Sequence, residues 1–171
     1  SFGMAALNSY YSTPSVADEH GFALADAPWP HIFDPFREAV AGKKVAVIGH
    51  FPFAPKALNQ AADFYMLERS LNEGDYPDSA AEYILPECDY VFITGSAFVN
   101  KTAPRLLELS RESFNVVLGP STPLDPILLQ DYGVSQVTGI VPTDAAGMFE
   151  CLEEGSSLDM FNFGHRVSLG T

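Results

Sequence analysis

The chain has 171 residues, of which 47% are hydrophobic, so it has the composition of a folded domain with one core rather than of a disordered chain. It carries 22 Asp and Glu against nine Lys and Arg, and its formal net charge of -13 opposes contact with the phosphates of a nucleic acid. No apolar run approaches the roughly 20 residues of a membrane helix. We therefore expect a soluble, acidic protein whose partner is a small molecule or a metal ion, with no nucleic acid or membrane partner.

The two cysteines, Cys88 and Cys151, are not spaced as a CxxC pair, and no secretory leader precedes them. We expect a reduced, cytoplasmic setting without a disulfide. Cys88 lies before a predicted strand and Cys151 lies on a predicted helix, so both are expected to be small core residues.

The first residues, SFGMAALNSYYSTP, have the spacing of a helix that Pro14 ends. Because the chain starts without Met and directly inside this pattern, we expect residues 1–14 to be the last helix of an N-terminal domain that is otherwise missing. Residues 15–42 are expected to be a connector. It holds a short helix near Pro35–Ala41, and Trp29 in this connector is expected to cover core surface.

From Lys43 onward, apolar runs alternate with segments of helical spacing. Strands are predicted at residues 43–51, 63–69, 88–96, 115–119 and 134–141. Helices are predicted at residues 52–62, 78–86, 102–113, 126–133 and 144–155. Continuous Val, Ile and Phe runs between helices indicate a parallel sheet that is covered on both faces. We therefore predict that residues 43–171 form a three-layer α/β domain with a mostly parallel sheet of five to six strands, with residues 158–171 as the candidate for an edge strand.

Small, hydroxylated or charged residues follow four of these strands, in the sequences GHFP, LER, TGSAFVNKT and GPSTP. In a parallel α/β sheet the carboxyl ends of the strands open onto one crevice. We expect these clusters to converge there although they are spread over about half of the chain.

The first crevice residues are titratable. GHFP stands where a dinucleotide-binding domain carries GxGxxG, and since only Gly49 is present, the sequence gives no firm support for NAD or FAD. His50 is a candidate metal ligand or acid–base group, or a turn histidine bonded to backbone. Glu68 is a candidate for a metal or a ribose hydroxyl, with a surface ion pair to Arg69 as the alternative. Asp75 is a second candidate carboxylate, or forms an Asx turn.

The remaining clusters are mostly uncharged. The one after the third strand comprises Thr94, Gly95, Ser96, Asn100, Lys101 and Thr102. Thr102 is expected to cap the next helix, a role that does not explain Asn100 and Lys101, and Asn100 is a candidate for ligand binding. The one after the fourth strand comprises Gly119, Pro120, Ser121 and Thr122. Here Ser121 or Thr122 is expected to cap a helix that begins at Pro123, with anion binding as an additional hypothesis.

Taken in order, the motifs GMAALNSYYSTP, VIGHFP, LER with EGDYP, ILPECDYVFITGSAFVNKT, LLELSR and GPSTPL resemble the "putative heavy-metal chelation" domain family, long catalogued as a domain of unknown function. The resemblance extends over nearly the whole chain. It implies a Rossmann-like carboxyl-terminal domain, preceded in full-length members by a smaller domain like the amino-terminal part of enolases, with the site between the two. The residues that it marks are His50, Glu68, Thr94, Gly95, Asn100, Thr102, Gly119, Pro120 and Ser121, with Asn8 from the first helix. Lys101, where many relatives have Gly, departs from the family pattern.

Three functions remain open at this point. In the first, the crevice binds a divalent transition metal or a metal-containing small ligand through His50 with Glu68 or Asp75. In the second, it binds an adenosine-type or other polar metabolite, as in a transferase or lyase, with Glu68 on a ribose diol. In the third, the chain is a scaffold or interaction domain that self-associates, as a homo-oligomer, through exposed apolar surface.

Overall fold

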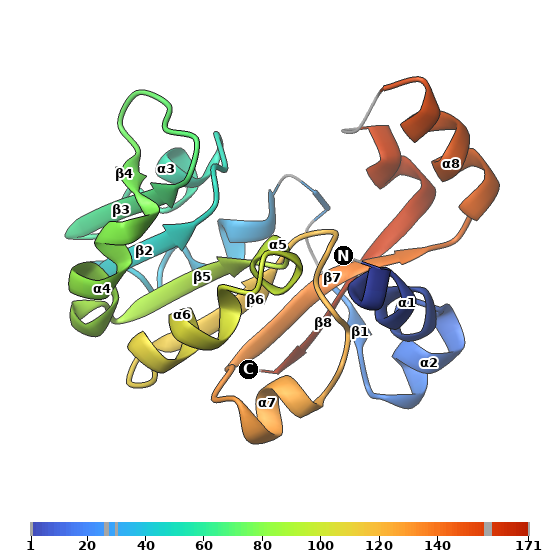
Figure 1. Ribbon diagram of the computed structural model, residues 1–171, viewed down its shortest axis with the longest axis horizontal. Coiled ribbons are helices and arrows are strands. Elements are labelled where there is room, and N and C mark those ends of the chain that lie inside the picture. The colour runs from blue at the N-terminus through green and yellow to red at the C-terminus, as the bar shows by residue number, and fades with distance from the viewer. Residues whose placement is uncertain (1, 26–27, 30, 156–158, 171) are drawn as a thin grey trace.

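The computed structural model describes residues 2–25, 28–29, 31–155 and 159–170. Within these residues the centre of the protein is one eight-stranded sheet with the strand order β1-β8-β7-β6-β5-β2-β3-β4 (Figure 1). The strands are β1 Ala23–Leu24, β2 Lys44–Ile48, β3 Asp63–Glu68, β4 Tyr76–Pro77, β5 Tyr90–Thr94, β6 Phe114–Leu118, β7 Gln136–Pro142 and β8 Gly164–Gly170.

Helices pack around this sheet. The α-helices are α1 Phe2–Tyr11, α2 Pro14–Glu19, α3 Ala54–Ala57, α4 Ala81–Ile84, α5 Ser96–Val99, α6 Ala103–Leu109, α7 Ile127–Asp131 and α8 Ala145–Glu153. The 3-10 helices are η1 His31–Phe36, η2 Asp78–Ala80, η3 Leu85–Glu87 and η4 Asp159–Phe163.

The sheet is mostly parallel. Strands β7, β6, β5, β2, β3 and β4 pair in parallel, and only β8 and β1 run antiparallel to their neighbours. Consecutive residues of β2 alternate between two hydrophobic clusters: Ala46 and Ile48 join one, whereas Val45 and Val47 join the other. A strand that is apolar from Val45 to Ile48 therefore buries both faces, as predicted for a covered parallel sheet. The α/β class and the predominantly parallel sheet are confirmed.

Several predicted boundaries were wrong. The sheet is larger than predicted because β1 and β4 have only two residues each, too few for a periodic pattern. Strand β8 pairs on both sides, so β1 rather than the carboxyl-terminal segment forms that edge. The helices predicted at residues 52–62 and 102–113 shorten to α3 and α6. Leu106 and Leu107 are buried, but Leu109 is only half-buried.

The connector also differs from the prediction. The helix expected near Pro35–Ala41 is the 3-10 helix η1, which ends at Phe36. Trp29 is partly buried and packs against the core, as expected. Residues 26, 27 and 30 of the connector lie outside the described residues.

Helix α1 lies against the carboxyl ends of the central strands rather than within the core. None of its described side chains is buried, although Tyr11 packs at the margin of the core. The Asn8 Nδ2 donates to the Ser121 carbonyl at 3.0 Å. The Tyr11 hydroxyl bonds the Asp125 carboxylate, which raises the pKa of Tyr11. Two contacts thus fix α1 to the loop after β6, and its origin in a further domain stays a prediction.

The cysteines behave as small core residues. Cys88 and Cys151 are both buried. Burial raises the pKa of the Cys88 thiol to about 11. Among the helices of the described ranges, none is both long and apolar enough to cross a membrane.

Candidate functional site

A cavity of about 540 Å³ opens at the carboxyl ends of β2, β3 and β5. Its floor is apolar and includes Ile48, Leu67 and Ala97, the ends of the buried strands and the start of α5. Seven of the residues singled out from the sequence line it: Gly49, His50, Glu68, Thr94, Ser96, Asn100 and Thr102. The parallel sheet therefore brings together side chains that are separated by up to half of the domain in sequence.

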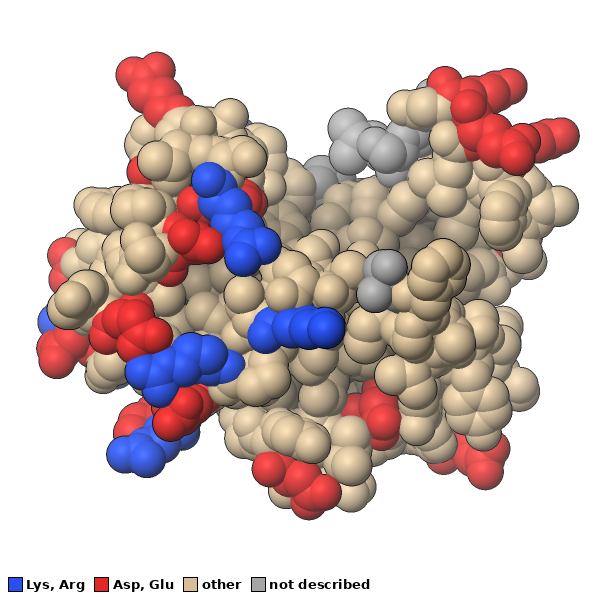
Figure 2. Space-filling model, viewed as in Figure 1, with Lys and Arg blue, Asp and Glu red and all other residues tan. Residues whose placement is uncertain are grey.

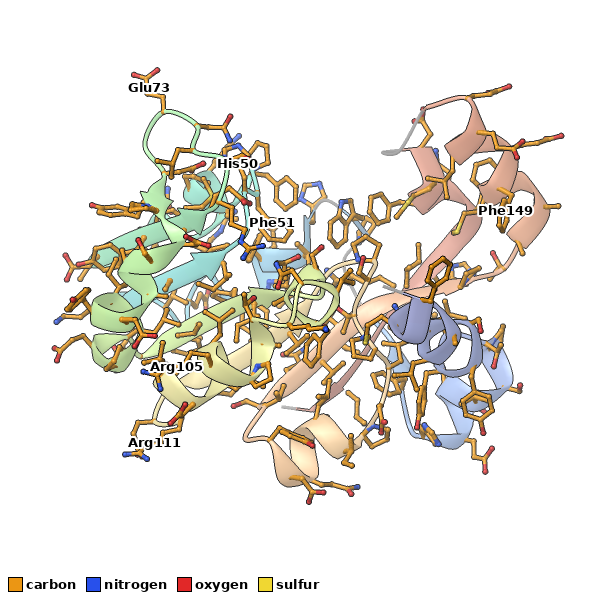
Figure 3. All side chains as sticks on the ribbon, viewed as in Figure 1. His50, Phe51, Glu73, Arg105, Arg111 and Phe149 are labelled. Carbon is orange, nitrogen blue, oxygen red and sulfur yellow. The ribbon has the colours of Figure 1, made fainter. Side chains whose placement is uncertain are left out.

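His50 and Asp75 form a hydrogen-bonded pair at this cavity. Gly49, with a positive φ of 105°, turns the chain after β2 and places His50 beside the loop between β3 and β4. The His50 Nδ1 lies 2.9 Å from Oδ2 of Asp75. The Asp75 side chain has no exposed surface, whereas the His50 side chain keeps 30% of its own. In Figure 3, His50 and Phe51 lie at the end of β2, while Glu73 points outward from the tip of the neighbouring loop.

Asp75 is a charged anchor within its loop. Desolvation alone would raise the pKa of this carboxyl, but hydrogen bonds from Asn72 and His50 outweigh it and hold the pKa below its ordinary value. The backbone N–H of Asn72 donates to Asp75 Oδ2 at 3.0 Å, so the carboxylate ties its own loop together. This donor lies three residues before Asp75, not two residues after it, so the bond is not the predicted Asx turn.

Glu68 lines the cavity, but both oxygens of its carboxylate already accept backbone donors. Oε2 accepts the N–H of His50 at 3.0 Å, and Oε1 accepts the N–H of Arg69 at 2.6 Å. This arrangement ties the end of β3 to the turn after β2. It leaves Glu68 positioned as a support for the His50 backbone, and the predicted ion pair with Arg69 is absent because Arg69 Nε donates to Asp78 at 3.1 Å.

The segment after β5 is organised by Asn100 rather than by Thr102. Asn100 Oδ1 accepts both the backbone N–H of Thr102 at 3.1 Å and its hydroxyl at 2.7 Å. Thr102 precedes α6, but its side chain makes no capping bond to the helix, so the predicted role was wrong. The backbone of Thr102 lies in the helical region, at a φ of -89° and a ψ of -19°, rather than in the extended region of a capping residue, and its hydroxyl donates to Asn100. Between them, Lys101 adopts a φ of 68°, the only positive φ of a non-glycine residue in the described part of the chain.

Charged side chains close the outer side of the cavity, and sequence reasoning missed most of them. Arg105 on α6 donates from Nε to Glu82 Oε1 on α4 at 2.9 Å and from Nη1 to Glu108 at 2.7 Å. The hydrogen bond from Arg105 lowers the pKa of Glu82. Arg69 and Asp78 form the second pair. On the face shown in Figure 2, the Lys and Arg side chains gather over the half that contains α4 to α6, and only Asp and Glu mark the half with α1, α2 and α8.

The predicted site residues after β6 do not line this first cavity. Gly119 and Pro120 line a second cavity of about 370 Å³, together with Trp29, Phe161 and the start of β8. Ser121 contacts α1 through its carbonyl, and Thr122 is only 1% exposed. No helix begins at Pro123, so the predicted capping by Ser121 or Thr122 was wrong.

The end of this segment has a different cap. Helix α7 starts at Ile127, and Asp125 Oδ1 accepts the backbone N–H of that residue at 3.0 Å. Gly95 packs against the backbone of Ser121 and Thr122, and this contact forms the boundary between the two cavities. The single predicted crevice is therefore two neighbouring cavities on the same edge of the sheet.

The metal-ligating side chains do not form a complete set of ligands. In the part of the chain that the structure describes, no three His, Cys, Asp or Glu side chains are arranged to hold a metal ion. His50 has Asp75 on one ring nitrogen, and Glu68 is bonded to backbone. Among the described residues that line the cavity, His50 is therefore the one with an imidazole, and its neighbour Glu68 is bonded to backbone.

Comparison with known proteins places the chain among proteins of unknown function. A model of the family described as "Putative heavy-metal chelation" matches residues 31–168. A crystal structure from Desulfitobacterium hafniense, described as a protein of unknown function from this family, has 42% sequence identity and a TM-score of 0.87 over 99% of this chain and 66% of that chain. An uncharacterized protein of Methanocaldococcus jannaschii is 29% identical over 115 residues, which are 63% of this chain and 44% of that protein.

A second crystal structure from the same family, from Pyrococcus horikoshii, has a TM-score of 0.80 and 23% identity and covers 99% of this chain and 67% of that chain. At this identity the likeness shows the fold alone. The chain spans less than half of the curated relative and about two thirds of the two solved structures.

Proposed function

Because the chain belongs to the family described as "Putative heavy-metal chelation", we propose that the cavity at the ends of β2, β3 and β5 binds a transition metal ion held in a small chelating molecule. His50 supplies the one protein ligand, through Nε2. The metal is cargo in this proposal rather than a resident cofactor.

The His50–Asp75 pair is the observation that carries the proposal. Asp75 is charged and fully covered, so its carboxylate accepts the Nδ1 proton of His50. This contact fixes the tautomer that leaves the lone pair of the ring on Nε2. A carboxylate behind an imidazole is the usual support of a histidine that binds a metal, since it orients the ring and raises its basicity.

The shape of the cavity supports a ligand larger than a bare ion. Its volume of about 540 Å³ lies within the range of roughly 300–1,000 Å³ that small-molecule sites have. The described residues provide no group of three metal ligands. A metal already chelated by a small molecule needs only one or two further ligands, and that is what the protein offers here.

A matched pair of histidine variants tests the proposal. His31 also places Nδ1 2.9 Å from an aspartate, Asp34, but on the outer side of η1 and with a carboxylate that is 39% exposed. We expect Ni²⁺–nitrilotriacetate and Ni²⁺–diethylenetriamine to bind the protein in isothermal titration, and both to lose affinity in His50→Ala but not in His31→Ala.

A third variant examines the supporting carboxylate. Asp75→Asn keeps the shape of the side chain but removes its charge, and we expect about 10-fold or more weaker binding of both nickel chelates. Circular dichroism checks that each variant is folded. Equal losses in His50→Ala and His31→Ala, or binding to the unaltered protein weaker than about 100 μM, would overturn the proposal.

A further inference from the structure

The cavity concentrates positive charge in a chain that has little of it. Its lining contains three of the nine Lys and Arg residues of the whole sequence, namely Arg69, Lys101 and Arg105. It contains only three of the 22 Asp and Glu residues, namely Glu68, Asp78 and Glu82. The lining of the cavity thus holds a third of the basic residues of the chain but only about a seventh of its acidic residues. In a protein with a net charge of -13, a lining in which Lys and Arg equal Asp and Glu in number opposes an anion less than the average surface does.

Two of the three cations are already neutralised by carboxylates. Arg69 is paired with Asp78, and Arg105 is paired with Glu82 and Glu108. These pairs hold the two arginines at the rim, and the carboxylates compensate the positive charge of both guanidinium groups. The carboxylate of Glu68, the remaining acid, is bonded to two backbone N–H groups.

Lys101 is the exception. It lines the cavity, and its ammonium group has no hydrogen bond or ion pair with any residue of the described ranges. Its backbone lies in the left-handed region at a φ of 68°, where a glycine would be free of strain and a lysine is not. The Asn100 side chain, bonded to Thr102 on the other side, holds this conformation. The chain therefore keeps a strained, unpaired cation at the mouth of the cavity.

We infer that Lys101 binds an oxyanion group of the ligand, a carboxylate or a phosphate, and so selects a negatively charged chelate. This inference rests on the proposed function, in which the cavity takes a metal in a small chelating molecule. It names the class of that molecule: an anionic chelator. His50 contacts the metal, and Lys101 contacts the charged group of the chelator.

Two nickel complexes of opposite charge separate the two roles. Ni²⁺–nitrilotriacetate has carboxylate arms and a net negative charge, whereas Ni²⁺–diethylenetriamine has amine arms and a net positive charge. We expect Lys101→Gln to weaken binding of the first by about three- to tenfold and to leave the second unchanged or slightly tighter. His50→Ala weakens both. A loss in His50→Ala with no change in Lys101→Gln defeats the inference and keeps the proposed function. A loss in Lys101→Gln with no change in His50→Ala overturns the proposed function and leaves Lys101 as an anion contact alone.

Three further variants distinguish charge from structure. Lys101→Gly relieves the backbone strain and removes the charge, so it should match Lys101→Gln in binding while it does not lower the unfolding midpoint in urea. Lys101→Arg should retain most of the affinity. Lys43→Gln removes an equal charge from the opposite end of the sheet, where Lys43 lies 3.8 Å from Asp89, and should change nothing.

The kind of oxyanion is read from two probes without metal. Citrate and inorganic phosphate are titrated into the unaltered protein and into Lys101→Gln at low ionic strength, and the one that shows Lys101-dependent binding identifies the group. Added NaCl should weaken that binding, because the contact is exposed and screened. If neither probe and neither nickel complex responds to Lys101→Gln, the inference is wrong.

Discussion

The two cavities lie on the same edge of the sheet but have different walls. The first, at β2, β3 and β5, is bordered by ion pairs and by the His50–Asp75 pair. The second, at β6, β7 and β8, is bordered by glycines and by the stacked rings of Trp29 and Phe161, whose centroids are 4.4 Å apart. The parallel topology makes both openings, because strand ends converge at one edge. The side chains that follow each strand then decide that ion pairs border one opening, whereas stacked aromatic rings border the other.

The largest effect on the free energy of unfolding is expected at Gly95, which forms the boundary between the two cavities. A methyl group on Gly95 would lie 2.6 Å from the carbonyl carbon of Ser121 and still closer to the backbone nitrogen of Thr122. Backbone atoms cannot move aside as a flexible side chain can. We expect Gly95→Ala to lower the free energy of unfolding by about 3 kcal/mol, measured by urea denaturation.

The control for this variant is Gly3→Ala. Gly3 lies in α1, and no atom stands within 4 Å of the methyl group that it would gain. Because alanine is the better helix former, this change should stabilise the protein by about 0.5–1 kcal/mol or leave it unchanged. If Gly95→Ala lowers the free energy of unfolding no more than Gly3→Ala does, the contact at Gly95 is not a rigid boundary between the two cavities.

The second cavity depends on its aromatic wall, and a double-mutant cycle measures this. Trp29 and Phe161 stack with an interplanar angle of 13°. We expect Trp29→Ala and Phe161→Ala to show a coupling free energy of about 0.5–1.5 kcal/mol in thermal or urea unfolding. The coupling should not change with added NaCl, in contrast to the ionic wall of the first cavity. A coupling of zero would mean that the stack contributes nothing to this wall.

The difference between the two cavities was only partly visible in the sequence. Continuous apolar runs predicted the parallel strands, and the strand ends predicted that His50, Glu68 and Thr94 would lie at one edge. The pairing of Arg105 with Glu82 could not be predicted, because it joins two helices whose relative position depends on tertiary packing. The same holds for Asn100, because only the folded loop places its Oδ1 2.7 Å from the hydroxyl of Thr102. A single crevice was predicted because the alternation of residues along a strand does not reveal where two loops touch. Here Gly95 lets the loop after β5 touch the loop after β6, and this contact divides the crevice.

The smallest expected effect is a pH dependence that belongs to the first cavity alone. The native pKa of Asp75 lies below its ordinary value, so the ionised form stabilises the fold. Its contribution is fully present above the unfolded pKa and is lost as pH falls from about 5 through the native pKa. Asp75→Asn lacks this contribution, so its free energy of unfolding should fall less steeply over the same range in urea titrations. Glu73→Gln removes one charge from the same loop at an outward-pointing position (Figure 3) and should keep the slope of the unaltered protein, which separates the effect of the His50–Asp75 pair from that of net charge. Equal slopes for the unaltered protein and Asp75→Asn would show that the His50–Asp75 pair does not stabilise this wall, and the contrast between the two cavities would then rest on the exposed ion pairs.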